Sequence, residues 1–189
     1  MPLPLILASA SPRRLDLLRQ IGLEPSKVDP ADTDETPRAA EPPRAYALRM
    51  AEAKLAIVAA RHPGALVLAA DSVVAVGRRI LPKAESEAEA RQCLALLSGR
   101  RHKVLGAIAV GARGKTKTRL VETAVRFKRL ERSEIESYVK SGEWKGKAGG
   151  YAIQGRAASF VAFISGSYSN VVGLPLFETA ALLRAMGEV

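Results

Sequence analysis

Two serines and two arginines stand together where an apolar run ends and a helical pattern begins. Residues 3–8 are apolar, and residues 9–14 read SASPRR. Ser11 suits the position before a helix, and Pro12 suits its first turn because the missing N–H would be unpaired there in any residue. The first-turn amides, the hydroxyls of Ser9 and Ser11, and the guanidinium groups of Arg13 and Arg14 would then converge. Phosphate is the ligand that this combination suits, and a capped helix with solvated arginines is the alternative.

One carboxylate, Asp71, stands within residues 67–76, which otherwise have the composition of a strand buried on both faces. An unpaired buried charge is costly, so Asp71 needs either a partner or a chemical purpose. A desolvated carboxylate beside a lysine or a bound cation is how an enzyme obtains a general base or a metal ligand. A structural aspartate bonded to the backbone at a strand end is the alternative.

Three further charged residues could serve the same site. Lys54 falls in a predicted helix and Lys83 in a predicted loop, on either side of the Asp71 strand in the sequence. Glu35, with Asp34, lies in an acidic, proline-rich loop, and carboxylates that leave room for waters are the usual way to hold Mg²⁺ against a substrate phosphate. Solvated surface side chains are the alternative for all of them.

Two glycine-containing segments could approach a ligand. Residues 149–155 read GGYAIQG, and Gln154 there can offer one acceptor and two donors to a nucleobase edge. Residues 166–175 form either a second ligand loop or a strand-to-helix connection. The sequence GKT at residues 114–116 is not a phosphate-binding loop, because the first glycine of that motif is replaced by Ala109; it predicts a basic hairpin turn.

Composition indicates a folded chain with an anionic ligand. The 189 residues are 48% hydrophobic, which suits one domain over residues 1–189, and the formal net charge is +10. Nucleic acid is the obvious polyanionic partner, but aromatic residues are only 5% and no RNA-binding or zinc-finger motif occurs. A phosphate-rich small molecule explains the charge equally well, and we expect no nucleic-acid partner.

Cysteine, histidine and the first apolar run exclude other classes. The lone Cys93 rules out disulfides and cysteine-cluster metal sites within a monomer, and we expect it in the core. His62 and His102 lack ligand-like spacing and are assigned to turns or the surface. The first apolar run is too short for a signal-peptide core or a membrane span, so a soluble cytoplasmic protein without membrane association is expected.

The elements that must position these residues alternate between strand and helix patterns, which predicts a mixed α/β fold with at least one antiparallel pair. Capping boxes at residues 86–89 and 133–136 open two of the helices, and residues 111–114 join two strands in a hairpin. Strands are predicted at residues 3–8, 65–76, 103–110, 117–126 and 158–164, helices at 12–21, 44–61, 86–97, from 133 and after 175, and loops at 29–43 and 142–155.

Together these segments resemble the Maf family of nucleoside triphosphate pyrophosphatases, from residue 7 almost to the C-terminus. The motifs that carry the resemblance stand in the family's order, namely residues 7–14 (LASASPRR), 70–74 (ADSVV), 97–102 (LSGRRH), 148–155 (AGGYAIQG) and 166–176 (GSYSNVVGLPL). The resemblance implies a two-lobed mixed α/β fold similar to inosine triphosphatases, with a central cleft, and a homodimer.

The resemblance also implies an activity. Residues 151–155 (YAIQG) look like the branch that hydrolyses dTTP and UTP to the monophosphate and pyrophosphate with Mg²⁺ or Mn²⁺. A 7-methyl-GTP or broad inosine triphosphatase-like pyrophosphatase is an alternative, as is a non-catalytic nucleotide- or nucleic-acid-binding regulator of septum formation.

By the resemblance, Asp71 is the proton acceptor, and the nucleotide site is lined by Ser9, Arg13, Lys54, Lys83 and Gln154. Arg13, Ser72 and Gln154 occupy the positions associated with substrate choice. Ser72 departs from the family's threonine, which affects selectivity more than activity. Glu35 and Asp71 are the candidate metal ligands.

Overall fold

The computed structural model of the chain describes residues 3–186, and these residues build a seven-stranded mixed sheet with helices on both faces. The sheet order is β2-β1-β3-β5-β6-β7, and β4 pairs with β3. The β1 strand is parallel to β2 and β3, and the other pairs are antiparallel. The predicted mixed α/β class is confirmed. The ends of the predicted domain, residues 1–2 and 187–189, lie outside the described residues.

The strands are β1 (Leu5–Ala8), β2 (Lys27–Val28), β3 (Leu66–Val76), β4 (Arg79–Leu81), β5 (Arg101–Ala112), β6 (Lys115–Phe127) and β7 (Val161–Ser165). The helices are α1 (Pro12–Gln20), α2 (Pro43–Arg61), α3 (Glu87–Leu97), α4 (Arg132–Ser141), α5 (Tyr168–Val172) and α6 (Leu176–Ala185), with a 3₁₀ helix, η1 (Arg156–Phe160). No helix in the described part of the chain combines the length and apolar character needed to cross a bilayer.

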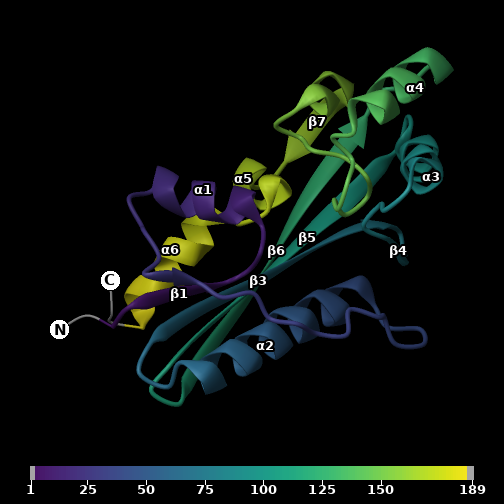
Figure 1. Cartoon of the computed structure of the whole chain (residues 1–189). Helices are drawn as coiled ribbons and strands as arrows, with labels where there is room; N and C mark the ends of the chain where they lie inside the picture. The colour runs from purple at the N-terminus through teal and green to yellow at the C-terminus, as the bar shows by residue number, and fades with distance from the viewer. Residues whose placement is uncertain (1–2, 187–189) are drawn as a thin grey trace.

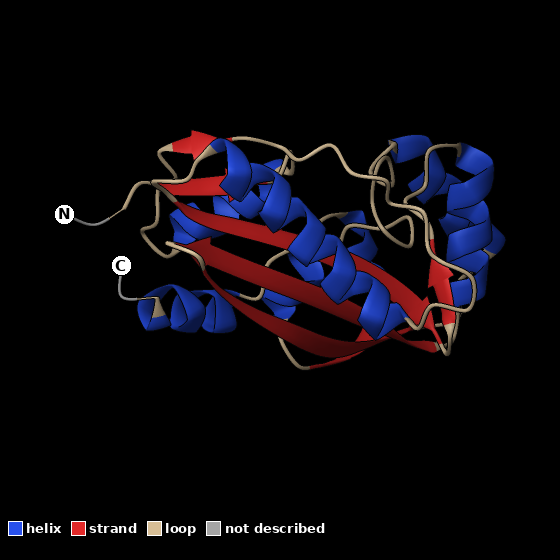
Figure 2. Ribbon diagram, turned by 90° about the horizontal axis from the view of Figure 1, so that it is seen from below, coloured by secondary structure: helices blue, strands red, loops and turns tan. Residues whose placement is uncertain are grey.

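The helices cover the two faces of the sheet unequally. The long α2 lies along one face, and α1, α5 and α6 lie on the other (Figures 1 and 2). Side chains of β3 alternate between these layers, with Val67 and Ala69 packed toward α2 and Leu66 and Leu68 packed toward α1 and α6. The same alternation sends the side chains of Asp71 and Ser72 to opposite faces of the strand.

A third apolar cluster fills the far end of the molecule, where α3, α4 and β7 gather (Figure 1). Cys93 is buried in this cluster, as predicted. The assignment of His102 to a turn or the surface is wrong, because it lies within β5 and is 1% exposed. The strand alternation turns its ring inward between the exposed Arg101 and Lys103, and the ring packs edge-on against Phe127 and Tyr151. His62 does stand at a helix end, where its ring contacts Asp29.

Most predicted elements occur, with local differences. The hairpin between β5 and β6 turns through Arg113 and Gly114, both at positive φ, as a two-residue turn requires. The last predicted strand begins later, because pairing with β6 starts only at Val161 and the preceding residues form η1. The capping box of α4 is formed by Glu131 and Glu134 instead of by Ser133. The two shortest strands, β2 and β4, were not predicted.

Candidate active site

A cavity of about 400 Å³ lies between the two ends of the molecule, above the middle of β3. Its walls come from the turn between β1 and α1, the loop before α2, α2 itself, β3, the segment after β4, and the loops that precede η1 and α6. Every residue that the sequence analysis assigned to a nucleotide or metal site lines this cavity: Ser9, Arg13, Glu35, Lys54, Asp71, Ser72, Lys83 and Gln154. The structure therefore brings the candidates together, and their individual roles remain predictions.

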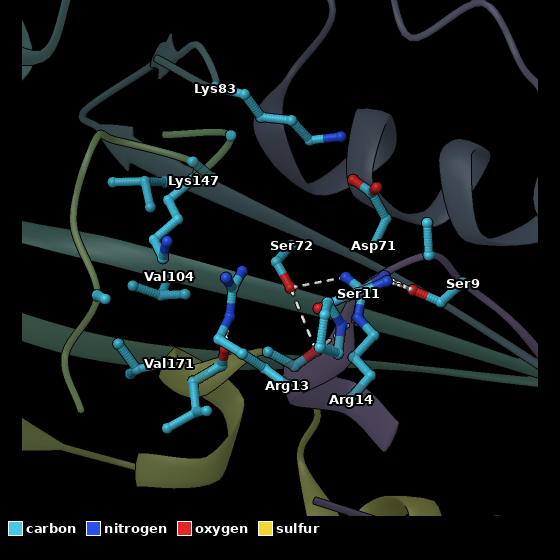
Figure 3. A pocket seen from close by; sticks show the side chains of 18 of the residues that line it. Ser9, Ser11, Arg13, Arg14, Asp71, Ser72, Lys83, Val104, Lys147 and Val171 are labelled. Atoms are coloured by element: carbon cyan, nitrogen blue, oxygen red, sulfur yellow. Dashed lines mark hydrogen bonds between the residues drawn. The ribbon is translucent and has the colours of Figure 1, made fainter. Parts of the chain in front are cut away.

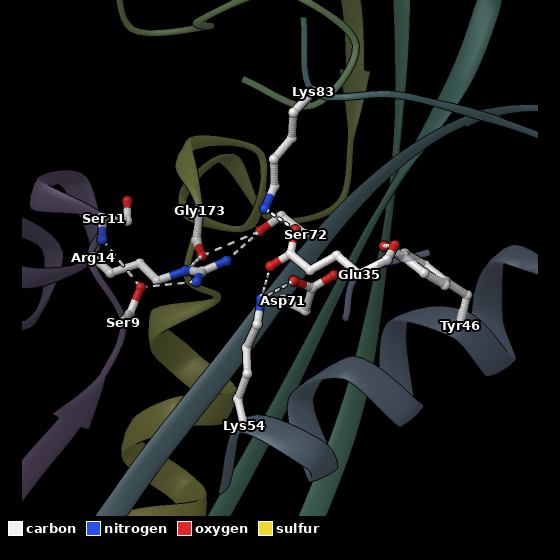
Figure 4. Close-up of polar contacts among 10 residues, drawn as sticks. All are labelled: Ser9, Ser11, Arg14, Glu35, Tyr46, Lys54, Asp71, Ser72, Lys83 and Gly173. Atoms are coloured by element: carbon white, nitrogen blue, oxygen red, sulfur yellow. Dashed lines mark hydrogen bonds and ion pairs between the residues drawn. The ribbon is translucent and has the colours of Figure 1, made fainter. Parts of the chain in front are cut away.

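One side of the cavity is a chain of ion pairs, which we call the ion-paired side (Glu35, Lys54, Asp71 and Lys83). The Lys54 ammonium lies 2.7 Å from Oδ1 of Asp71 and 2.6 Å from Oε1 of Glu35. The other Glu35 oxygen contacts the ammonium of Lys83 (Figure 4). Asp71 is 4% exposed and Lys54 is 7% exposed, so the central pair is almost fully removed from solvent. The partner that the buried Asp71 required is therefore present.

Helix and strand periodicity explain this pairing. Lys54 lies on the buried face of α2 with Met50, Ala51 and Val58, three or four residues away, and that face packs on β3. Asp71 projects from β3 toward the same helix.

Glu35 is supplied by the loop before α2. Tyr46 of α2 donates its hydroxyl to the Glu35 carbonyl at 2.7 Å, which holds this part of the loop. Burial alone would raise the pKa of Glu35, but the hydrogen bonds and charges of Lys54 and Lys83 outweigh it and lower the pKa to about 2. Glu35 is therefore ionised at neutral pH. Among residues 3–186, no cluster of three or more histidine, cysteine or carboxylate side chains forms a ready metal site.

The structure corrects the expected role of Arg14. Its Nε donates to the Gly173 carbonyl at 2.9 Å, and its terminal nitrogens donate to Oγ of Ser9 at 3.0 Å and of Ser72 at 3.1 Å (Figure 4). Burial lowers the pKa of Arg14. This guanidinium therefore links the turn between β1 and α1 to β3 and to the loop before α6. Its nitrogens are all engaged within the protein and are not free for a two-pronged contact with phosphate. Ser11 occupies the predicted cap position, but its side chain makes no capping bond.

Arg13 and Lys147 form the opposite wall, which we call the cationic side. Only Nε of Arg13 has a hydrogen-bond acceptor within the described residues, the Val172 carbonyl at 3.1 Å. The side chains of Arg13 and Lys147 lie on the same side of Ser72, away from Asp71 (Figure 3). Burial lowers the pKa of Arg13 and of Lys147, and the charge of Arg13 lowers that of Lys147 further. No carboxylate contacts either cation among residues 3–186.

Lys147 was missed by the sequence analysis. It lies in the predicted loop 142–155, and its proximity to two glycines of the AGG motif was the available signal. A bridge between Lys83 and Ala148 draws this loop onto the segment after β4. Gly149 has a φ of +67°, and a Cβ there would lie 2.8 Å from a methyl carbon of Val74, so a glycine is required for the close approach.

Gln154 lies on the exposed part of the same loop and lines the cavity. Its side-chain amide has no hydrogen-bond partner within residues 3–186 and is thus available to a ligand. The cavity lining as a whole is strongly cationic, since its only carboxylates are Glu35 and Asp71, whereas its basic residues are Arg13, Arg14, Lys54, Lys83, Lys145 and Lys147. Such a cavity suits a polyanion presented to a buried carboxylate.

Comparisons with known proteins identify the family of this chain. Residues 4–186 match the family model described as Maf-like protein. A protein of Paramagnetospirillum magneticum named dTTP/UTP pyrophosphatase is 65% identical over 184 residues, which cover 97% of each chain. Proteins with the same name from Rhodospirillum rubrum and Caulobacter vibrioides are 64% and 61% identical, cover 97% of this chain, and are themselves covered over 88% and 95% of their length. The chain belongs to the Maf-like protein family.

Proposed function

We propose that this protein is a nucleoside triphosphate pyrophosphatase that hydrolyses dTTP and UTP to the nucleoside monophosphate and pyrophosphate. The observation that carries the proposal is the buried carboxylate of Asp71, set in a cavity whose other charged groups are mostly cations. A pure polyanion binder gains nothing from such a carboxylate, whereas a hydrolase needs one. The names of the similar proteins support the same activity and do not favour a 7-methyl-GTP hydrolase or a non-catalytic regulator.

Asp71 acts as the proton acceptor in this proposal. A water molecule attacks the α-phosphorus, the bond to the bridging oxygen of the β-phosphate breaks, and Asp71 takes the proton of the water. Lys54 holds Oδ1 of Asp71 in place through an ion pair of 2.7 Å. Lys54 and Lys83 offset the charge that develops on the departing pyrophosphate, and Arg13 and Lys147 bind the substrate from the opposite wall.

A divalent cation, Mg²⁺ or Mn²⁺, fits the ion-paired side. The carboxylates of Glu35 and Asp71 both reach one ammonium group, so two oxygen ligands stand close together without a third protein carboxylate. Mg²⁺ is commonly held by one or two carboxylates with substrate phosphates and waters completing its shell. Glu35 and Asp71 would hold the cation, which when bound neutralises phosphate charge and lowers the pKa of a bound water.

Gln154 is proposed to select the base. Thymine and uracil share a carbonyl oxygen next to a ring N–H, and a side-chain amide can pair with both atoms. Cytosine presents an exocyclic amine and an unprotonated nitrogen at those positions, so an amide held in one orientation would leave buried polar groups unpaired. Ser72 lines the same cavity, and its hydroxyl accepts from Arg14 at 3.1 Å, so it shapes the pocket without being free to turn.

Steady-state pyrophosphate release with dTTP, UTP, dCTP, dGTP, ATP and 7-methyl-GTP tests this function. We expect the highest kcat/KM for dTTP and UTP, and a loss of that preference by about tenfold in Gln154→Ala. Gln92→Ala, an exposed glutamine on α3 outside the cavity, is the matched control. A preference for 7-methyl-GTP in the unmodified enzyme would overturn the proposed substrate. An unchanged ranking in Gln154→Ala would remove Gln154 as the base reader.

We further propose that the enzyme works in the cytoplasm, where its nucleotide substrates are made, and that it is a homodimer. Analytical ultracentrifugation at micromolar concentration would test the second point, and a purely monomeric species would contradict it.

A further inference from the structure

The loop that carries Gln154 has an aromatic support that the proposed mechanism does not use. Nε2 of His102 lies 2.8 Å from the hydroxyl of Tyr151, and both side chains are buried. The rings of His102, Phe127 and Tyr151 pack edge to face in a closed set, with centroids 4.9–5.5 Å apart. His102 does not line the cavity, whereas Tyr151 does. The hydroxyl of Tyr151 therefore links His102 directly to a residue of the cavity wall.

A second aromatic residue fixes the next position of the loop. Tyr138 of α4 accepts the backbone N–H of Ala152 at 3.0 Å through its hydroxyl, and this bond is buried. Two successive loop residues are thus anchored from behind, one by its side chain and one by its backbone. Ala152 lines the cavity, and Gln154 follows two residues later. Without these anchors the loop could place the Gln154 amide in several positions.

The His102–Tyr151 pair is uncharged at neutral pH. Burial lowers the pKa of His102 to about 4, against the opposing effect of a hydrogen bond with the Arg100 backbone. Burial also raises the pKa of the Tyr151 hydroxyl far above its ordinary value. A hydrogen bond between two neutral buried groups serves geometry, because removing either partner leaves the other unsatisfied.

We propose that His102 is a positioning residue for substrate selection, which acts through the Tyr151 hydroxyl to hold the Gln154 loop in register with a pyrimidine base. The inference rests on the proposed function, since it concerns the same loop. It assigns base selection to a group on β5 that has no contact with the cavity. The consequence is a specific kinetic signature, in which substrate binding suffers and the chemical step does not.

Tyr151→Phe tests this with the loss of one oxygen atom, and His102→Leu removes the other partner. We expect each variant to raise KM for dTTP and UTP by about fivefold and to leave kcat within about twofold, with the preference over dGTP reduced by a similar factor. The double variant should bind dTTP no worse than either single variant, because it leaves no unpaired polar group. Should His102→Leu fail to fold, Tyr151→Phe carries the test alone.

Hydrogen–deuterium exchange supplies a readout that does not depend on the substrate. The amides of residues 149–155 should exchange faster in Tyr151→Phe than in the unmodified protein. Ser98→Ala is the matched control, since it removes a hydroxyl that accepts the Leu130 N–H at 2.8 Å outside the cavity, and it should leave both loop exchange and KM unchanged.

Unchanged exchange together with an unchanged substrate ranking in Tyr151→Phe would overturn the positioning role. A fall in kcat for all substrates at constant KM would overturn it too. If the unmodified enzyme turned over neither dTTP nor UTP, the proposed function would fail, and exchange in the 149–155 loop would still decide whether the Tyr151 hydroxyl orders that loop.

Discussion

The two walls of the cavity handle charge in opposite ways. On the ion-paired side, Lys54 is shared between Asp71 and Glu35, and Glu35 also contacts Lys83. On the cationic side, Arg13 and Lys147 face the cavity with no carboxylate partner in the described chain. Charges that the protein neutralises itself can be buried and held rigidly. The charge of Arg13 instead lowers the pKa of Lys147, and an anion bound between them would relieve that repulsion. The first wall is therefore suited to chemistry and the second to capturing substrate.

We expect the largest loss of activity when the divalent cation proposed for the ion-paired side is removed by chelation. Treatment with EDTA should abolish pyrophosphate release, and adding Mg²⁺ or Mn²⁺ in excess should restore it, because the divalent cation that Glu35 and Asp71 would hold neutralises part of the charge of the phosphate chain. The thermal unfolding midpoint in EDTA serves as the control and should remain that of the untreated protein. Full turnover of dTTP in the presence of EDTA would contradict the metal requirement.

Asp71→Asn tests the chemical role of the same wall. We expect kcat to fall by about 10²-fold or more, because the proton acceptor is lost with almost no change in volume. KM should change little, since the cationic side is intact. Asp16→Asn, on the exposed face of α1, is the control for loss of one carboxylate. A variant with unimpaired turnover would show that Asp71 is a structural partner of Lys54 only.

Arg13→Ala and Lys147→Ala probe the cationic side. Arg13→Ala should lower kcat/KM for dTTP by about tenfold, and Lys147→Ala by less, because a guanidinium can grip phosphate with two parallel bonds. The loss should lie mainly in KM and should shrink at high salt. Arg13→Lys separates charge from fork geometry, and Arg184→Ala on α6 controls for the loss of a surface cation. If Asp71→Asn and Arg13→Ala changed KM and kcat in the same proportions, the two walls would not differ in role.

The smallest effect concerns the acid stability of the ion-paired side. The pKa of Glu35 is lowered to about 2 in the folded protein, so its ionic contacts stabilise the fold above its ordinary pKa of 4.5, and this contribution is lost as the pH falls toward 2. The unmodified protein should resist urea better than Glu35→Gln near neutral pH, and this difference in stability should shrink in acid. Because Glu35 is about one third exposed, solvent screening keeps the difference small. A difference in urea resistance between the two proteins that increased as the pH fell would contradict this prediction.

The sequence predicted which residues meet, but not how each is used. Periodicity and turn signals were enough to predict α2, β3 and the hairpin, and the motifs around Arg13, Asp71 and Gln154 predicted a shared pocket. The pattern could not show that the Arg14 guanidinium donates a hydrogen bond to the Gly173 carbonyl, because that acceptor lies 159 residues away and is a backbone atom. It also gave no sign that His102 is buried, since burial there depends on Phe127 and Tyr151 from other elements.

The other features that the sequence did not predict are either very short strands or residues positioned by contacts with other elements. Strands of two or three residues such as β2 and β4 have no detectable periodicity, and they form only where β1 and β3 offer an edge. Lys147 belongs to a loop, and the bridge between the neighbouring Ala148 and Lys83 brings that loop beside the cavity. Tertiary contacts decided these features, and local sequence did not encode them.

The arginine contacts across the chain also bear on how the protein is made. Arg13 and Arg14 are synthesised before their backbone acceptors, Val172 and Gly173, which follow 159 residues later. During synthesis the sheet strands up to β6 can pair while both guanidinium groups still lack these carbonyls, since domains acquire contacts as the chain emerges. Nascent chains interrupted before residue 172 would therefore contain Asp71 and Lys54 but have no locked first turn. The arginine contacts that order the first turn therefore form only after residues 172 and 173 have been synthesised.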